Sequence, residues 1–526
     1  MKAINIQPVL ITLNFIEIYK RYRCHASKNL KQIKNILLKF SFLLFLTISF
    51  SSFAQDSIIY QPDQMQKDLL KFKAALIKTH PGIYEYQTPE EFELFMNQLM
   101  SEVSKPLEGK IFFKLILKLV ANIHDAHTEV HPFKELGEIF KNQKRLPLQV
   151  FIKNQRIFVV RNMSDQSIPE GSEIISIDGS LSNGIVSKML EHYSADGLST
   201  LGMQHYLGVS YLSFSRTYPI VYDEKPTYKI TYKDYSTREI VTKTIASISR
   251  KDYLKTELNR YDNNSNKYKE KAFDFKIDEK EKYAYLQITR FFKDSFQEPE
   301  STYPDYYREC FKEIENKNIK HLIVDLRDND GGKLSNAAHL LRYFVKKPFT
   351  PTNEITTKGN DEYYLKAIGD TLSFNSDFGL ERKINGDYKV TKFDYLTELN
   401  VFNPIDKYNY NGKIIVLIDG GAASAGGSGP AILQEYTDAV FIGSETFGTA
   451  GVGNGINKTY ILGDHTGVAI SIPLMHSDIA INEHLKRRGV LPDYEISNSI
   501  NNIVNNKDVI MEFALEKLFT KKHKNH

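Results

Sequence analysis

Short apolar runs alternate with longer amphipathic runs between residues 283 and 442, and this alternation limits the folds open to the chain. The short runs have the length and composition of strands and occupy 283–288, 321–325, 413–418 and 439–442. Between them lie segments with helical spacing, at 306–316, 334–344 and 430–436. This order predicts a mixed or parallel sheet covered by helices. In such a sheet, reactive groups collect in the loops beyond the carboxyl ends of the strands.

Two other patterns precede this region. Apolar residues recur at helical spacing from residue 60 to about 136, with a break at residues 80–82, His-Pro-Gly. Strand-like runs follow at 146–152, 156–160, 173–177 and 228–232, with a short helix at 185–192 and a polar linker at 260–271. We therefore predict an α/β multidomain protein. Its parts are a helical N-terminal segment (55–140), a β-rich domain (145–255), an α/β core (275–500), and a C-terminal helix with a basic tail (501–526).

The first 54 residues have the features of a leader with a signal peptide. They carry eight Lys and Arg against one acidic residue, and an apolar run follows at 40–50. Ser52 and Ala54 place small residues where signal peptidase cuts. The run is shorter than the ~20 residues that span a bilayer. We expect export, to the periplasm or the extracellular space if the source is bacterial, with no membrane span after leader removal. A retained membrane anchor is the alternative.

The body of the chain is close to electrically neutral. The whole sequence has 68 Lys and Arg against 64 Asp and Glu, and residues 55–526 have 60 against 63. Such a balance gives no general attraction for a polyanion, so we expect no nucleic-acid partner. With 41% hydrophobic and 25% charged residues, the composition is that of a globular protein.

Two turns that lead from a strand into a helix hold the candidate reactive groups. The first, VDLRDNDGG at 324–332, ends in a glycine pair, which permits positive φ and lets backbone N–H groups face a ligand. The second, IDGGAASAGGSGP at 418–430, surrounds Ser424 with small residues at the start of a helix. N–H groups at a helix start stabilise developing negative charge. Either turn by itself could be an ordinary loop.

Together the two turns resemble the C-terminal processing (tail-specific) serine peptidase family. The shared pattern is Asp-Leu-Arg-x-Asn-x-Gly-Gly at 325–332, Ala-Ser-Ala at 423–425, Gly-Ser-Glu-Thr-Phe-Gly at 443–448 and Gly-Val-Leu-Pro-Asp at 489–493. The resemblance covers roughly residues 280–495 and implies a mixed α/β catalytic core of the tail-specific protease (ClpP/crotonase-like) type. It extends to EGSEIISIDG at 170–179, which is similar to part of a PDZ domain. A PDZ-like domain over 145–255 would offer a groove for an extended peptide. An ordinary β-hairpin is the alternative there.

The resemblance assigns Ser424 as the nucleophile. It places the oxyanion hole at Gly331 or Gly332 and the N–H of Ala425. One position departs from the family pattern, because Thr449 stands where the processing peptidases have a lysine base. A threonine hydroxyl cannot act as a base near neutral pH. The sequence therefore excludes a Ser-Lys dyad at this position.

The base must come from another segment. The sequence Asp-Ala-His-Thr at 125–128 resembles the Asp-x-His-Thr motif of the tricorn-like and interphotoreceptor retinoid-binding relatives, which lack the catalytic lysine. The histidine of that motif belongs to a Ser-His-acid arrangement, so we assign His127 as the base. Imidazole suits the role because its ordinary pKa of about 6.5 lets it take and return a proton. Without the resemblance, His124 and His127 could be a helix-end pair or a chance metal pair.

Glu483 is the candidate for the third catalytic residue, because the tricorn-like relatives carry a glutamate before the Gly-Val pair. The usual spacing falls nearer Lys486, and a solvated surface charge is the alternative for Glu483. We expect Asp325 and Arg327 to hold their loop by hydrogen bonds. The chain has no His-Glu-x-x-His, no phosphate-binding loop and no dinucleotide fingerprint, so we expect no metal and no cofactor.

These features predict an exported serine-type peptidase that hydrolyses peptide bonds of polypeptides through an acyl-enzyme on Ser424. The prediction requires His127 and Ser424 to meet, although they are 297 positions apart. The alternative is a catalytically silent relative that binds peptides or apolar ligands.

Overall fold

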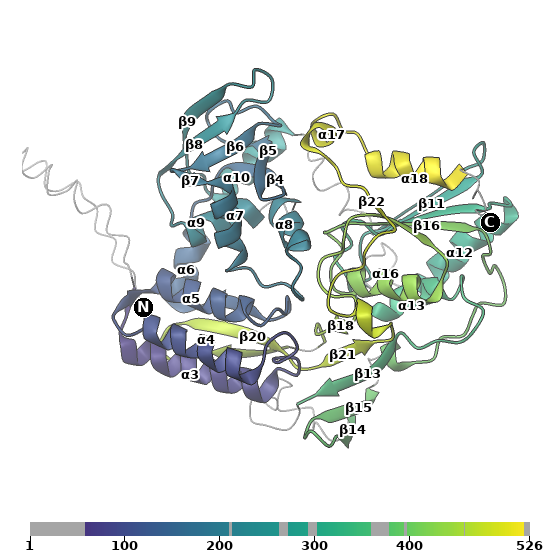
Figure 1. Ribbon diagram of the computed structural model, residues 1–526, viewed down its shortest axis with the longest axis horizontal. Helices are drawn as coiled ribbons and strands as arrows, with labels where there is room; N and C mark the ends of the chain where they lie inside the picture. Colours follow the sequence, from purple (N-terminus) through teal and green to yellow (C-terminus); the bar gives the residue numbers. More distant parts are fainter. Residues whose placement is uncertain are drawn as a thin grey trace, which may run out of the picture. The chain divides into compact units, whose positions relative to one another are not determined.

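The computed structural model of the protein describes residues 58–209, 213–261, 272–292, 302–358, 378–393, 397–456 and 458–519 (Figure 1). The predicted leader, most of the predicted 260–271 linker and the end of the basic tail lie outside the described residues. Among the described helices, none combines the length and apolar character needed to cross a bilayer.

Helices form the first part of the chain. They are α3 (Pro62–Thr79), α4 (Pro89–Glu102), α5 (Gly109–Ala121) and α6 (Lys134–Asn142), with a small ladder between β1 (Ile59–Tyr60) and β2 (Leu107–Glu108). Helix α4 begins where the sequence provides a cap, because Thr88 and Glu91 bind each other's backbone N–H groups and Pro89 follows the cap. The His-Pro-Gly break falls between α3 and α4, as predicted.

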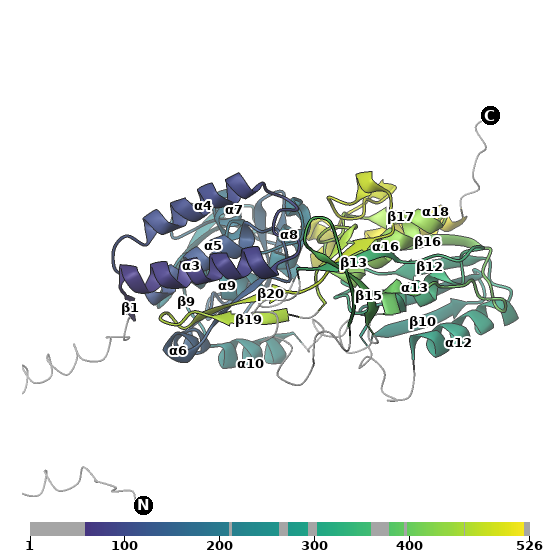
Figure 2. The same cartoon turned by 90° about the horizontal axis from the view of Figure 1, so that it is seen from below.

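A β-hairpin from a distant part of the sequence packs against this helical segment. Strands β19 (Lys458–Leu462) and β20 (Val468–Pro473) pair with each other, and β20 also pairs with β3 (Glu129–Pro132). β20 lies beside α3 (Figure 2). The strand and the helix share one apolar core. The turn of the hairpin is fixed by the buried Asp68 of α3, whose carboxylate accepts N–H groups from Asp464 and Thr466, each at 2.9 Å. The helical segment is thus completed by strands from beyond residue 457.

The β-rich part contains one sheet with strand order β4-β5-β6-β8-β9 and β7 paired to β6. Its elements are β4 (Leu148–Lys153), β5 (Arg156–Asn162), β6 (Glu173–Ile177), β7 (Ser180–Leu181), α7 (Ser182–Leu190), α8 (Thr200–Val209), α9 (Ser213–Val221), β8 (Thr227–Lys233), β9 (Ile240–Ala246) and α10 (Arg250–Arg260). The β4–β5 hairpin turns at Asn154 and Gln155, which both have positive φ. That is the geometry of the tight turns that join twisted antiparallel strands.

Helix α8 covers β4, the edge strand of this sheet. A Cβ atom on Gly208 would lie 3.0 Å from the backbone N of Ile152 and 3.2 Å from the O of Val150. The helix can approach the strand this closely because glycine has no side chain. The edge of β4 is therefore occupied by the chain's own helix.

The core is a six-stranded mixed sheet in the order β10-β11-β12-β16-β17-β22. Its strands are β10 (Phe273–Asp278), β11 (Tyr283–Ile288), β12 (His321–Asp325), β16 (Lys413–Ile418), β17 (Val440–Gly443) and β22 (Tyr494–Glu495). β10 is antiparallel to β11, and the remaining pairs are parallel. The α/β multidomain architecture predicted from the sequence is confirmed.

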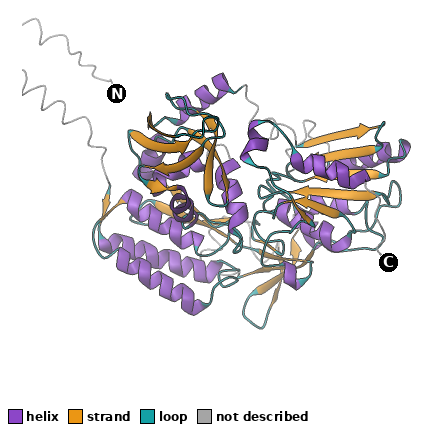
Figure 3. Cartoon of the chain, turned by 45° about the horizontal axis from the view of Figure 1, so that its top comes forward, coloured by secondary structure: helices purple, strands orange, loops and turns teal. Residues whose placement is uncertain are grey.

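Helices cover both faces of this sheet (Figure 3). Leu322 and Val324 of β12 point to the face covered by α12 (Tyr303–Asn316), α13 (Leu334–Leu341) and α16 (Ala425–Tyr436). Ile323, between them, packs on the opposite face against α18 (Val509–Phe519), which the short helix α17 (Ile500–Val504) precedes. This alternation is expected for a buried strand.

A smaller sheet links the core to the hairpin described above. Its order is β14-β15-β13-β21-β18. The strands are β13 (Thr352–Thr357), β14 (Phe378–Arg382), β15 (Tyr388–Phe393), β18 (Val452–Gly453) and β21 (His476–Ile479), and the short 3-10 helices are η3 (Thr397–Leu399) and η4 (Glu483–Leu485). β21 follows β20 directly, so the chain returns from the helical segment to the core here.

Candidate active site

Ser424 occupies a sharp turn between β16 and α16. It has φ 55° and ψ −126° and immediately precedes the helix, whose first residue is Ala425. A positive φ is uncommon for a residue with a side chain, and such strain persists only where the surroundings enforce it. Ser424 is partly exposed, while 425–433 are buried. The first N–H groups of a helix have no partner within the helix. Gly426 and Gly427 donate to the carbonyl oxygens of Ala423 and Ser424, each at 2.8 Å, so the turn presents the serine hydroxyl next to the N–H of Ala425.

The glycine pair lies against this turn. A Cβ atom on Gly331 would come within 2.7 Å of the Ser424 Cβ and 3.1 Å of the Ala425 N. The N–H of Gly331 donates to Asn329 Oδ1 at 2.8 Å. The structure thus brings together Ser424, Ala425 and the two glycines, all named from the sequence.

Asp419 joins the two loops. Its Oδ1 accepts the N–H groups of Asp328 at 2.9 Å and Gly421 at 3.0 Å. His205 of α8 adds a third group, with Nε2 3.4 Å from Asp328 Oδ1 and 3.8 Å from Asp419 Oδ2. Burial lowers the pKa of His205, but the carboxylates of Asp419 and Asp328 outweigh it and raise that pKa to about 9. Burial and the charge of Asp328 raise the pKa of Asp419 to about 6.

Sequence reasoning missed this cluster. Asp328 and Asp419 follow the neighbouring parallel strands β12 and β16, so their positions at strand ends could have indicated that they meet. No local pattern indicated His205.

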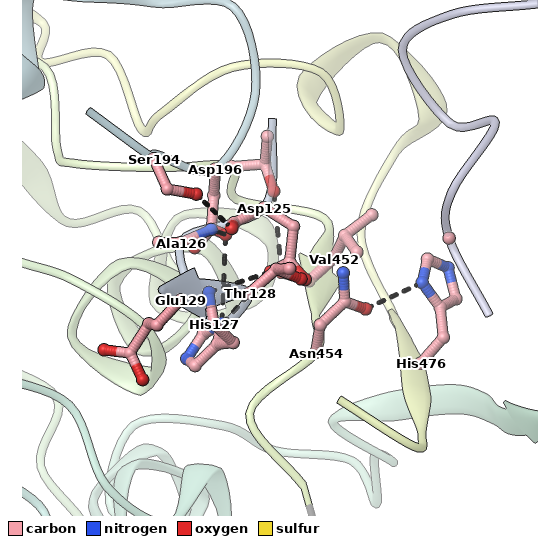
Figure 4. A network of polar contacts seen from close by, with 12 residues as sticks. Asp125, Ala126, His127, Thr128, Glu129, Ser194, Asp196, Val452, Asn454 and His476 are labelled. Atoms are coloured by element: carbon pink, nitrogen blue, oxygen red, sulfur yellow. Dashed lines mark hydrogen bonds and ion pairs between the residues drawn. The ribbon is translucent and has the colours of Figure 1, made fainter. Parts of the chain in front are cut away.

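His127 lies just before β3, which the pairing with β20 fixes in place. Its backbone N–H donates to Asp125 Oδ1 at 3.0 Å. Its ring Nδ1 lies 3.5 Å from Asp125 Oδ1 and 3.8 Å from Asp196 Oδ1 (Figure 4). Burial lowers the pKa of His127, but the neighbouring carboxylates of Asp125 and Asp196 raise it overall.

Asp125 is held by a second histidine. The N–H of Gly82 donates to His80 Nδ1 at 3.1 Å, so the proton of this ring lies on Nε2, which donates to Asp125 Oδ2 at 2.7 Å. The hydroxyl of Thr128 donates to the same oxygen at 2.7 Å. Burial raises the pKa of Asp125, but the hydrogen bonds from His127 and His80 bring it well below its usual range. A buried carboxylate thus stands beside His127, although the sequence analysis gave Asp125 and His80 no role.

The Ser424 turn and the His127 segment meet at Phe447. Ala126 and Ala423 both pack into the small apolar cluster that contains Phe447. The chain then continues to Gly455, where a Cβ atom would lie 2.9 Å from His127 Nε2. Within the described part of the chain, Ser424 and His127 make no hydrogen bond to each other. The fold therefore brings their segments to one cluster without forming a dyad.

Glu483 lies on the surface. Its side chain is 86% exposed, and its carboxylate pairs with Lys486 Nζ at 2.5 Å. The carboxylates that contact His127 are those of Asp125 and Asp196. The third catalytic residue named from the sequence is thus not beside the proposed base in this structure.

Among the described residues, Lys486 packs against the Thr449 loop but does not replace the missing lysine base. Thr449 is buried, and its Oγ1 lies 3.5 Å from the O of Val452. Lys486 passes behind this loop, but its ammonium binds Asp478 at 2.6 Å as well as Glu483. These hydrogen bonds outweigh burial and raise the pKa of Lys486, so it stays protonated.

The motifs around the site that resemble the family pattern also contain ion pairs. Asp325 binds Arg327 through its Oδ1 at 2.9 Å, as predicted, and Arg327 also binds Asp508 at 2.8 Å. Glu445 is buried and pairs with Arg488 at 3.0 Å. These ion pairs fix the loops around the Ser424 turn.

Two groups of side chains have the composition of a cation site, with ligand atoms within 4.8 Å of one another. One contains Asp125, His127 and Asp196, and the other contains His205, Asp328 and Asp419. In both, the carboxylates also accept backbone N–H groups, and the histidine supplies the compensating charge. In each group, the histidine and the two carboxylates therefore interact with one another as charge pairs.

Residues 282–496 match the profile of peptidase family S41. The chain contains a peptidase family S41 domain. This confirms the family that the sequence motifs indicated. The S41 region contains Ser424, both glycines and Ala425, whereas His127 lies before it.

The similarity to solved structures covers more of the chain than the S41 region does. The structure of mature CPAF complexed with lactacystin has a TM-score of 0.59 at 15% identity, covering 87% of this chain and 97% of that one. The crystal structure of mature CPAF has a TM-score of 0.56 at 14% identity, covering 86% and 96%. The photosystem II D1 C-terminal processing protease has a TM-score of 0.40 at 12% identity, covering 87% and 98%. The two CPAF structures show a shared fold. No curated protein matched the chain significantly.

Proposed function

We propose that this protein is an exported serine-type peptidase that hydrolyses peptide bonds of polypeptides through an acyl-enzyme on Ser424, with His127 as the base. The observation that carries the proposal is the strained turn at Ser424, with Gly331 packed directly against its Cβ. A partly exposed serine at a helix start is well placed for nucleophilic attack, because nearby N–H groups stabilise the resulting oxyanion.

The oxyanion hole would use the N–H groups of Ala425 and Gly332. Ala425 begins α16 and so has a free N–H. The N–H of Gly331 is already bound to Asn329, which favours Gly332 as the second donor. Because Gly331 has no side chain, the two loops can then approach each other closely.

In the proposed reaction, His127 removes the proton of Ser424 as its oxygen attacks the peptide carbonyl. The protonated imidazole then gives that proton to the leaving amine, and water hydrolyses the ester by the reverse steps. Asp125 would orient the ring and stabilise its charged form. We prefer Asp125 to Glu483 because it is buried and lies 3.5 Å from His127 Nδ1. His127 must approach Ser424 when substrate binds, since catalytic hydrogen bonds often tighten only in the complex.

The proposed base places the protein in a branch of the family without the catalytic lysine. Thr449 occupies the lysine position, and the ammonium of Lys486 is held by two carboxylates. Export rests on the basic and apolar leader over residues 1–54. A PDZ-like groove over 145–255 stays a prediction, and a peptide that paired along β4 would have to displace α8.

Labelling with a fluorophosphonate probe tests the proposal. The parent protein should label, and both Ser424→Ala and His127→Ala should abolish labelling. Ser428→Ala, in the same helix, and His131→Ala, on β3, are matched controls that should label like the parent. A folded parent that does not label, alone or with a peptide ligand, would favour the catalytically silent alternative.

A further inference from the structure

A concave site lies in the β-rich part of the chain, and none of the residues that line it belongs to the Ser424 turn. It has a volume of about 310 Å³ and is formed where the β4–β5 hairpin, the start of β6 and the end of β8 meet the segment that begins α17. α17 contacts β5, as Figure 1 shows. The cavity is thus built from two parts of the sequence more than 250 positions apart.

The charges around the cavity are unbalanced. Lys153, Arg156, Lys233 and Arg238 line it, against the single carboxylate of Glu173. Arg156 already neutralises Glu173, since its Nε donates to Oε1 at 2.7 Å. The remaining cations therefore produce a positive potential inside a concave surface.

These remaining cations are available to a ligand. Lys153 Nζ donates to Ser497 Oγ at 2.7 Å and to the O of Asn498 at 3.1 Å, and both acceptors are neutral. Across the described ranges, neither Lys233 nor Arg238 takes part in an ion pair. Arg238 lies over the ring of Tyr235, with its Cζ 5.7 Å from the ring centroid, and both cations attract the charge of Glu173 without contacting it.

The floor of the cavity is apolar. Phe151 and Phe158 both line it, and their ring centroids are 6.4 Å apart. Ile500 contributes from α17. Cations around an aromatic floor match a ligand that carries carboxylates next to apolar groups. A peptide that alternates acidic and apolar side chains has this chemistry.

We propose that this cavity binds an acidic segment of a polypeptide, with Lys233 and Arg238 pairing to its carboxylates and Phe151 and Phe158 contacting its apolar side chains. The site is separate from the Ser424 chemistry, and binding does not depend on catalysis. A bound segment would contact both the β-rich sheet and α17. It would attach its polypeptide to the enzyme at a site outside the Ser424 turn.

Fluorescence anisotropy with the full chain carrying Ser424→Ala tests the site without cleavage of the probe. The probe is a fluorescein-labelled peptide of alternating glutamate and leucine with an amidated C-terminus. We expect saturable binding, lost when glutamine replaces glutamate. Lys233→Glu should weaken binding about tenfold, because an attractive charge becomes a repulsive one. Lys229→Glu is the matched control, since it is exposed on the same strand but does not line the cavity.

Equal weakening by both substitutions would overturn the proposal, because it would show only long-range attraction. Absence of saturable binding to the parent would also overturn it. Tighter binding of a peptide with a free C-terminus than of the amidated peptide would show that the cavity binds a terminal carboxylate. That result would contradict the proposal of an acidic segment. Circular dichroism of each variant confirms that the fold is retained.

Discussion

Gly331 and Ser424 are packed so closely that a Cβ atom on the glycine would lie 2.7 Å from the serine Cβ. The two residues come from loops that follow neighbouring parallel strands, β12 and β16. Their contact aligns the glycine pair with the start of α16.

Gly331→Ala should therefore reduce peptidase activity by at least about a hundredfold, the size of effect seen when an oxyanion donor is lost. The added methyl group would push the glycine loop away from the Ser424 turn. The measurement is kcat/KM on a peptide substrate beside the unfolding free energy. Gly179→Ala is the matched control, because Gly179 has φ 85° against 88° for Gly331, and nothing lies within 4 Å of its Cβ position. Similar losses of activity in both variants would contradict the prediction.

The orientation of His127 by Asp125 can be tested through the pH profile. Asp125→Asn removes the carboxylate that raises the pKa of His127. A general base works only when unprotonated, so the acidic limb of kcat/KM should move to lower pH while kcat falls. Glu483→Gln should leave the limb unchanged, because that side chain is 86% exposed and pairs with Lys486. A shift in Glu483→Gln instead would restore Glu483 as the catalytic acid.

Because of His205, the free energy of unfolding should fall as the pH rises into the alkaline range. Its pKa of about 9 is above the ordinary value of 6.5, so the protonated form stabilises the folded state. This contribution is fully present below pH 6.5 and is lost as the pH rises through about 9. The loss amounts to at most about 3 kcal/mol.

Urea denaturation of the parent and His205→Gln at pH 7 and pH 10 measures this effect. The difference in unfolding free energy between the two proteins should shrink at the higher pH. A difference that does not change between the two pH values would show that His205 is not protonated in the fold.

Asp68 should be important for both stability and activity. Asp68→Ala leaves the buried N–H groups of Asp464 and Thr466 without their acceptor, which should cost about 2–4 kcal/mol. Activity should also fall, because the hairpin it anchors carries β20, the partner of β3 next to His127. Thermal unfolding and probe labelling measure the two effects. Asp63→Ala, on the same helix but exposed, should change stability by less than about 0.5 kcal/mol.

The sequence by itself determined the local elements and the Ser424 turn. The strands at 173–177, 283–288, 321–325 and 413–418 have the predicted bounds. Apolar runs of this kind are set by the residues themselves and the turns that bound them. The resemblance carried by the sequence motifs named Ser424, Ala425 and Gly331 or Gly332, and the structure shows that their loops follow adjacent strands of one sheet.

Only the tertiary structure decided how the remaining parts come together. α16 begins at Ala425, five positions before the predicted 430–436 helix, because its glycine-rich first turns are buried in the core. Contacts between distant segments place Asp196 beside His127, α8 on the edge of β4, and the 458–473 hairpin on α3. Burial and pairing between distant segments have no period in the sequence, and so leave no local pattern to predict them.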